Sequence, residues 1–190
     1  MRTFIAIPIP ENIRLFLTRI QADIRDNRVK ASWTRKASMH LSLRFLGDIE
    51  LEDIKMIIQA MKTTAATCEP FTLSAQGVGV FPGIKKARVI WAGIQGQVAQ
   101  LEMIQRTLEK YLQLAGIKGD KKRFSPHFTL GRFKGPVDIR KLEKIMQDFQ
   151  QCTSDDCLIT SMILYKSDLK PSGAVHTPLF EAVLSDIPSR

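Results

Sequence analysis

The feature that most constrains this chain is an internal repeat with an offset of 87 residues. The offset takes His40 to His127, and it takes Pro10, where a first helix is expected to begin, to Gln97, where a third begins. The order helix, histidine-bearing strand, helix therefore occurs twice in one register. Because each repeated unit must bury an apolar face, the repeat predicts two related lobes that face each other.

Hydrophobic periodicity supplies the other elements. Leu51 is expected to open the apolar stripe of the second helix, and Gly116 to cap the third. Predicted helices lie at 10–27, from 51 onward, 97–116 and 139–149, and predicted strands at 3–9, 39–46, 71–81, 88–93, 127–130, 158–165 and 175–184, the last two around a loop at 168–173.

These elements predict an α+β fold in which residues 1–190 form a single two-lobed domain. Each of the two pseudo-symmetric lobes is expected to hold a small, mainly antiparallel β-sheet backed by helices. The active site is expected in the central cleft between them.

Charge is the unusual part of the composition, since 28 Lys and Arg against 19 Asp and Glu give a net charge of +9. The surplus lies in residues 1–48, at +5, and residues 83–136, at +8, which are also the segments that carry the two histidine strands. Such a surplus favours polyanionic partners, among them nucleic acid and phosphorylated ligands.

Several classes of protein are disfavoured. The three cysteines, Cys68, Cys152 and Cys157, have no CxxC spacing, which argues against a disulfide framework and a zinc ribbon. No apolar window approaches the roughly 18 residues of a membrane span, and no signal peptide is recognisable. Motifs of zinc peptidases, phosphate-loop enzymes and dinucleotide-binding enzymes are missing. We expect a monomer in the cytoplasm that does not bind a membrane.

Each histidine strand carries a polar face. Because side chains alternate along a strand, His40 and Ser42 share one face of the first strand, and His127 and Thr129 share one face of the second. Each strand thus presents an imidazole with a hydroxyl two residues further on, while its apolar side chains pack behind. A single H-x-[ST] motif is weak, but the two copies fall on the same repeat. They predict a paired site.

An arginine contact to a phosphate has two candidates. Strict alternation puts Arg44 on the face of His40, and it turns Arg132 away from His127. A bulge at Gly131 would turn Arg132 back. Further basic residues are expected either to follow RNA phosphates or to be solvated: Lys85, Lys86, Lys121, Lys122 and Arg123.

The chain resembles the two-histidine (2H) phosphoesterases, and within them the RNA 2′,3′-cyclic phosphodiesterases, also called 2′-5′ RNA ligase-like proteins. Ser42 stands where the family usually has Thr, and His176 stands where relatives commonly have Tyr. The segments that carry the resemblance are RTFIAI at 2–7, HLSL at 40–43, FLG at 45–47, RVIWAG at 88–93, PHFTLGR at 126–132 and TPL at 177–179.

The resemblance implies a site and a reaction. His40 would be the general acid and His127 the general base, although the residues alone leave the two roles interchangeable. Ser42, Thr129 and Arg132 would bind the phosphate. RNA with a 2′,3′-cyclic phosphate end, for example a tRNA fragment, would be hydrolysed to a 2′-phosphomonoester without a metal or other cofactor. The same site could form 2′-5′ linkages in reverse, without ATP.

Two alternatives remain open from the sequence. One is a non-catalytic RNA-binding module with a basic cleft, which would bind RNA in a salt-dependent way. The other keeps the chemistry but changes the substrate, to a small cyclic phosphate of the ADP-ribose type or to an oligonucleotide 2′-5′ linkage.

Overall fold

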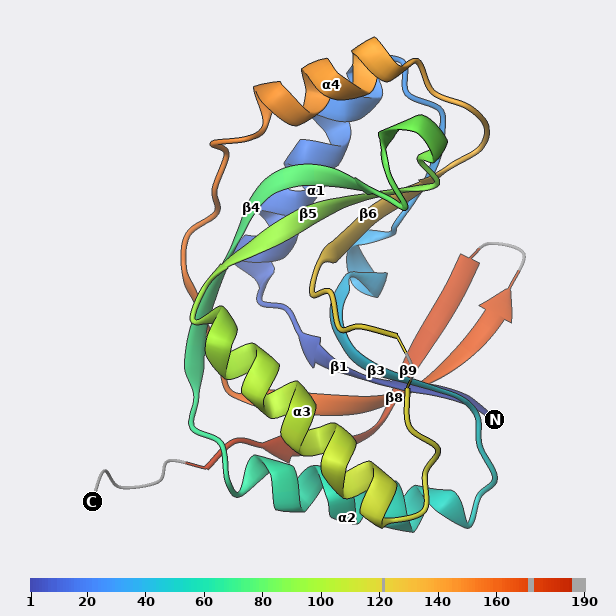
Figure 1. Cartoon of the computed structure of the whole chain (residues 1–190), viewed down its shortest axis with the longest axis vertical. Helices are drawn as coiled ribbons and strands as arrows, with labels where there is room; N and C mark the ends of the chain where they lie inside the picture. The colour runs from blue at the N-terminus through green and yellow to red at the C-terminus, as the bar shows by residue number, and fades with distance from the viewer. Residues whose placement is uncertain (121, 171–172, 186–190) are drawn as a thin grey trace.

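The computed structural model describes residues 1–120, 122–170 and 173–185, and it confirms the predicted α+β fold (Figure 1). The strands are β1 Arg2–Pro8, β2 Ala31–Trp33, β3 His40–Asp48, β4 Phe71–Phe81, β5 Val89–Gly96, β6 Phe128–Phe133, β7 Cys157–Ile159, β8 Ser161–Lys170 and β9 Gly173–Val183. The helices are α1 Glu11–Asp26, α2 Asp53–Ala65, α3 Val98–Leu114 and α4 Ile139–Asp148, with short 3₁₀ turns η1 Lys36–Ser38 and η2 Ile84–Lys86.

The strands form one curled antiparallel sheet with the order β7-β4-β5-β6-β3-β1-β8-β9, and β2 also pairs with β6. Its two halves are the two lobes, β7-β4-β5-β6 and β3-β1-β8-β9. They meet at the β3–β6 junction, where the one recorded pair of opposite residues is Leu41 and Phe128. The two predicted sheets are therefore continuous.

The elements follow the offset that the sequence predicts. β1 begins at Arg2 and β5 at Val89, and α1 begins at Glu11 and α3 at Val98, in each case 87 residues apart. Leu41 and Phe128, the pair that joins the lobes, are separated by the same number of residues. The junction therefore lies where a pseudo-twofold axis would pass.

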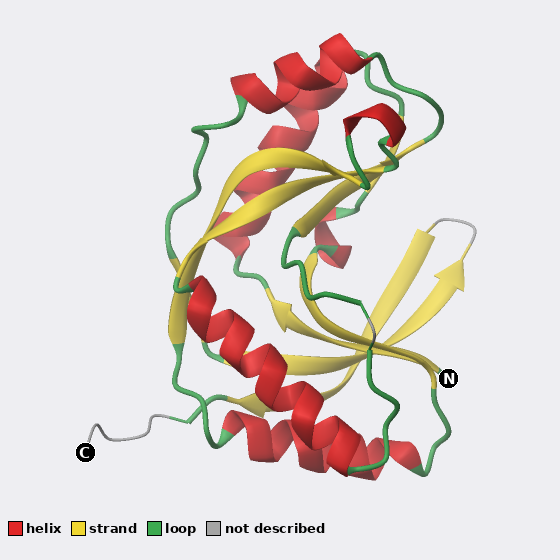
Figure 2. Ribbon diagram, viewed as in Figure 1, coloured by secondary structure: helices red, strands yellow, loops and turns green. Residues whose placement is uncertain are grey.

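The helices lie in two groups on either side of the curled sheet (Figure 2), and the repeats exchange helices between these groups. α1 follows β1 in the chain, but it packs against β4 beside the sheet of the other lobe, where α4 also lies. α3 follows β5, but it packs against α2 and β3. Gln21 of α1 fixes this crossing, since its buried amide donates hydrogen bonds to the carbonyl oxygens of Thr34 and Leu130. Each lobe is thus completed by a helix from the other repeat.

The core lies between the helices and one face of the sheet. The predicted apolar stripes of α1 and α3 are buried: Ile13, Leu17, Ile20 and Ile24 in α1, and Leu101, Ile104, Leu108 and Leu112 in α3. Burial of such stripes is the main favourable term in folding. None of the helices in the described ranges is long and apolar enough to cross a membrane.

Two expectations about elements need correction, and one short strand is absent from the predicted elements. Leu51 is 72% exposed and precedes α2, which begins at Asp53. The sequence does not predict β2, because its three residues have no strand pattern of their own and the strand is held by pairing with β6. Of the loop expected at 168–173, the described residues are strand, since β8 and β9 stay paired as far as Lys170 and Gly173, and residues 171–172 lie outside the described residues. Gly116 does end α3, with a φ of 84° that suits glycine.

Candidate active site

The two histidine motifs lie around the junction of the lobes. Leu41 of β3 and Phe128 of β6 are opposite each other, and both are buried beneath the sheet. In an antiparallel pair, one step along this register brings His40 opposite Thr129 and Ser42 opposite His127. All four side chains are half-buried on the face of the sheet opposite the buried Leu41 and Phe128. The structure therefore brings the four predicted residues together.

Both imidazoles are held in the same way. Nδ1 of His40 lies 2.8 Å from the carbonyl oxygen of Ser38, and Nδ1 of His127 lies 2.7 Å from the carbonyl oxygen of Ser125. Because a carbonyl only accepts hydrogen bonds, Nδ1 carries the proton in each neutral ring. Nε2 then has a free lone pair, and it is the nitrogen that would exchange a proton with a ligand.

β3 and β6 each contain a bulge at the same repeat position, and the bulge changes which side chains share a face of the strand. Leu130 of β6 is skipped between the partners of Ile90 and Trp91, and Leu43 of β3 is skipped in the pairing with β1. Each bulge reverses which face the following residues occupy. Arg132 is consequently exposed and returns to the face of Thr129, as the sequence allowed for a bulge near Gly131.

The bulge in β3 places Arg44 outside the site. The expectation that alternation aligns Arg44 with His40 is wrong, because the bulge at Leu43 turns Arg44 to the helix-covered face. Its side chain is only 7% exposed, and it forms an ion pair with Glu109 of α3. Phe45 takes the position on the site face instead and is 59% exposed.

Burial shapes the charge of the two imidazoles. It lowers the pKa of His40 from 6.5 to about 4, with smaller contributions from His176 and His127, and the hydrogen bond to Ser38 opposes this shift. Burial also lowers the pKa of His127, and the positive charge of Arg132 lowers it further. Both rings are therefore neutral at pH 7 in the unliganded protein.

Aromatic rings flank both histidines, and the sequence analysis did not assign them to the site. Phe4 lies against His40 with ring centroids 4.7 Å apart, and Phe81 lies edge-on to His127 at 4.9 Å. Trp91 lies 6.2 Å from His127 and is the repeat equivalent of Phe4. The repeat could have revealed this pair, since residues 4 and 91 are 87 apart.

His176 also belongs to the surroundings of His40. Its ring is perpendicular to that of His40 with centroids 5.2 Å apart, and it lies edge-on to Phe4 at 4.9 Å. His176 of β9 therefore lies directly beside His40. Of the other basic residues, Lys85 and Lys86 lie in η2 and Lys122 and Arg123 are exposed, whereas Lys121 is outside the described residues.

The curled sheet and the two matched imidazoles agree with the resemblance to the two-histidine phosphoesterases. The family model described as "LigT like Phosphoesterase" matches residues 7–91. Curated relatives named RNA 2′,3′-cyclic phosphodiesterase include one from Methanothermobacter thermautotrophicus, 27% identical over 94% of this chain and 96% of the relative. Another, from Thermotoga maritima, is 29% identical over 95% of this chain and 94% of the relative.

Solved structures agree with the fold. The crystal structure of TT0787 of Thermus thermophilus matches with a TM-score of 0.79 and 27% identity over 97% of this chain and 98% of that chain. The structure of E. coli LigT complexed with 3′-AMP has a TM-score of 0.78, with 22% identity over the same shares of the two chains. The chain is therefore similar to the LigT-like phosphoesterases over residues 7–91, and the fold of nearly the whole chain matches these solved structures.

Proposed function

We propose that this protein hydrolyses 2′,3′-cyclic phosphate ends of RNA to 2′-phosphomonoesters. The observation that carries the proposal is the matched pair of imidazoles, each with Nδ1 bound to a backbone carbonyl and, among the described residues, no hydrogen bond at Nε2. The names of the curated relatives support the cyclic phosphate as substrate, and the net charge of +9 suits a polyanion.

The proposed reaction needs one proton removed and one delivered. Nε2 of His127 accepts a proton from water while the water oxygen forms a bond to phosphorus. The bond between phosphorus and O3′ breaks, and Nε2 of His40 delivers a proton to O3′. The phosphate remains on O2′. Ser42, Thr129 and Arg132 would bind the non-bridging oxygens, where negative charge is held in the transition state.

The charges of the site support this division of roles. Burial and the charge of Arg132 lower the pKa of His127 and so keep that ring neutral, which is the state a general base needs before the reaction. His40 must be protonated to act as the acid, although its pKa in the free protein is about 4. The negative charge of a bound phosphodiester raises that pKa, because an opposite charge favours the imidazolium. Substrate binding would therefore charge His40.

Substitution of each histidine tests the proposal. His40→Ala and His127→Ala are each expected to lower kcat on an oligonucleotide with a 2′,3′-cyclic phosphate end by about 10²–10⁴-fold. Lys144→Ala, on the exposed side of α4, is the control and should leave turnover unchanged. Turnover close to wild type in either histidine variant would refute the assignment. RNA binding with no hydrolysis by the wild type would instead support the non-catalytic module.

The choice of substrate and the reverse reaction belong to the same proposal. By microscopic reversibility, a 5′-hydroxyl in place of water would give a 2′-5′ linkage without ATP. Comparison of kcat/KM for an RNA end, a small cyclic phosphate of the ADP-ribose type and a 2′-5′-linked oligonucleotide separates the three substrates. A preference for either of the last two would overturn the assignment to RNA ends.

We also propose that residues 1–190 act as one domain of two repeats, and that the protein is a cytoplasmic monomer. The continuous sheet and the exchange of α1 and α3 support a single domain. The free thiols of Cys68, Cys152 and Cys157 are compatible with a reducing compartment. Sedimentation of the purified protein measures its oligomeric state.

A further inference from the structure

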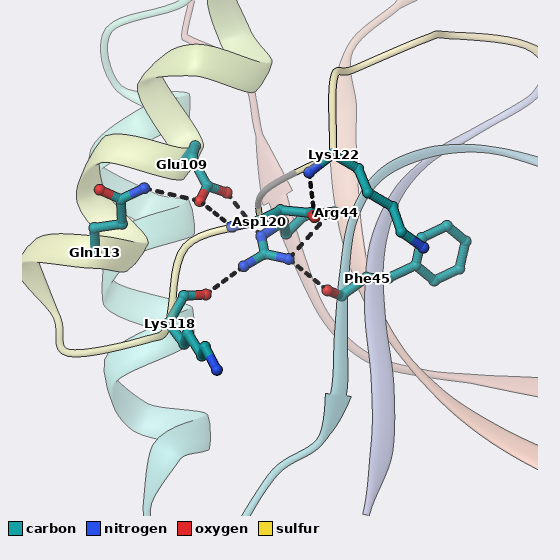
Figure 3. Close-up of polar contacts among 7 residues, drawn as sticks. All are labelled: Arg44, Phe45, Glu109, Gln113, Lys118, Asp120 and Lys122. Atoms are coloured by element: carbon teal, nitrogen blue, oxygen red, sulfur yellow. Dashed lines mark hydrogen bonds and ion pairs between the residues drawn. The ribbon is translucent and has the colours of Figure 1, made fainter.

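A charge cluster around the buried Arg44 links the strand of His40 to the segment that precedes His127 (Figure 3). The guanidinium of Arg44 lies 2.7 Å from a carboxylate oxygen of Glu109 and 3.4 Å from one of Asp120. It also donates hydrogen bonds to the carbonyl oxygens of Phe45, at 2.7 Å, and of Lys118. One side chain of β3 thus contacts α3, its own strand and the chain between α3 and β6.

The two carboxylates extend this cluster along the chain toward His127. Glu109 accepts hydrogen bonds from the backbone N–H of Asp120 and from the amide of Gln113, both at 2.9 Å. Asp120 accepts one from the backbone N–H of Lys122, also at 2.9 Å. The cluster therefore fixes the backbone on both sides of residue 121, a few residues before His127.

The repeat shows what this cluster replaces. In the first repeat, the segment before His40 contains β2, Ala31–Trp33, which is held on β6 by backbone pairing of Ser32 with Arg132 and of Trp33 with Gly131. An offset of 87 residues takes Ala31–Trp33 to Lys118–Asp120, and it takes Arg44 to Gly131. Lys118–Asp120 forms no strand. The side chain of Arg44 makes the connection there instead.

The identities of the two equivalent residues fit this exchange. A Cβ atom on Gly131 would lie 3.1 Å from the ring of Trp33 and 3.2 Å from the carbonyl oxygen of Ser32, so a side chain would push β2 away. Arg44 is paired with Ile5 of β1, but Lys118–Asp120 on its other side forms no strand, and there the guanidinium of Arg44 makes the contacts instead. Backbone pairing of β2 with β6 therefore positions the segment before His40, and the side chain of Arg44 holds the segment before His127.

We propose that Arg44 is a positioning residue for His127. Arg44 holds the chain between α3 and β6 against β3, and this contact sets the position of one imidazole relative to the other. Arg44 does not face the phosphate and is not itself a catalytic residue. Because proton transfer requires close placement of the base, loosening this segment should lower kcat more than it changes KM. The inference rests on the proposed function for its kinetic part only.

The test is Arg44→Met, which keeps the length and apolar character of the side chain and removes its charge. We expect kcat to fall about 10- to 100-fold, with KM for a mononucleoside 2′,3′-cyclic phosphate changed by less than about threefold. In an NMR titration, the pKa of His127 should rise toward its ordinary value of about 6.5 as the ring loses its buried position, while that of His40 stays low. Arg44→Lys, which keeps the charge but not the several contacts, should recover part of kcat.

Two further variants separate positioning from stability. Arg44→Met combined with Glu109→Leu removes the two least exposed charges of the cluster and leaves only the carboxylate of Asp120, which is 31% exposed and can be solvated, so the fold should be restored. If kcat and the His127 titration stay altered in this stable double variant, the proposal is supported; if both return to wild type, Arg44 has only a structural role. Lys144→Gln, which breaks an exposed ion pair with Asp148 on α4, should change neither readout. Since the titration does not depend on turnover, it remains decisive even if the proposed reaction fails.

Discussion

Burial of His40 makes the stability of this protein depend on pH. The pKa of His40 is about 4 in the folded protein and about 6.5 in an unfolded chain, so below pH 6.5 the unfolded state binds more protons. Folding stability that is present above pH 6.5 is therefore lost as the pH falls toward 4. The full difference corresponds to about 3 kcal/mol, of which about 2 kcal/mol is already lost at pH 5.

Urea unfolding at pH 7.5 and pH 5 measures this loss. The reference variant is His40→Asn, because the asparagine amide can still donate a hydrogen bond to the carbonyl of Ser38 but does not titrate. The wild type should lose about 2 kcal/mol more stability than the variant between the two pH values. Equal losses in the two proteins would refute the conclusion that His40 is buried as a neutral ring.

Three other predictions concern the reaction and the site. The pH profile of kcat/KM should be bell-shaped with its optimum below pH 6.5, because both imidazoles have lowered pKa values. The optimum of kcat should lie at a higher pH, because bound phosphate favours the imidazolium. EDTA should leave turnover unchanged; inhibition that added metal reverses would contradict a reaction carried by the histidines alone. Gly79→Ala would place a Cβ atom 2.3 Å from the ring of Trp91, so it should lower the free energy of unfolding by about 1–3 kcal/mol in thermal or urea melts and reduce kcat through the neighbouring His127.

The sequence was most informative where one rule acts locally. The stripes of α1 and α3 follow helical periodicity, and the faces of His40 and His127 follow from alternation over two residues. The repeat added what no local rule contains, namely that these two strands belong together.

The sequence failed where a partner decides the conformation. Alternation along β3 predicts Arg44 on the site face, but the bulge at Leu43 depends on how β1 pairs with β3. The strand β2 forms because β6 is beside it, and the crossing of α1 to the other lobe depends on packing between distant segments. Both bulges fall at the same repeat position. Gly131 permits the bulge in β6, but it is only an ambiguous signal for the bulge in β3.

The exchange of α1 and α3 between the lobes determines how this molecule can come apart. A chain cut between the repeats would separate strands that pair in one sheet and would leave each half with a helix whose apolar stripe has no surface to cover. We therefore expect that the lobes do not fold independently of each other. The two histidines would then be assembled in a single cooperative step and lost in the same step.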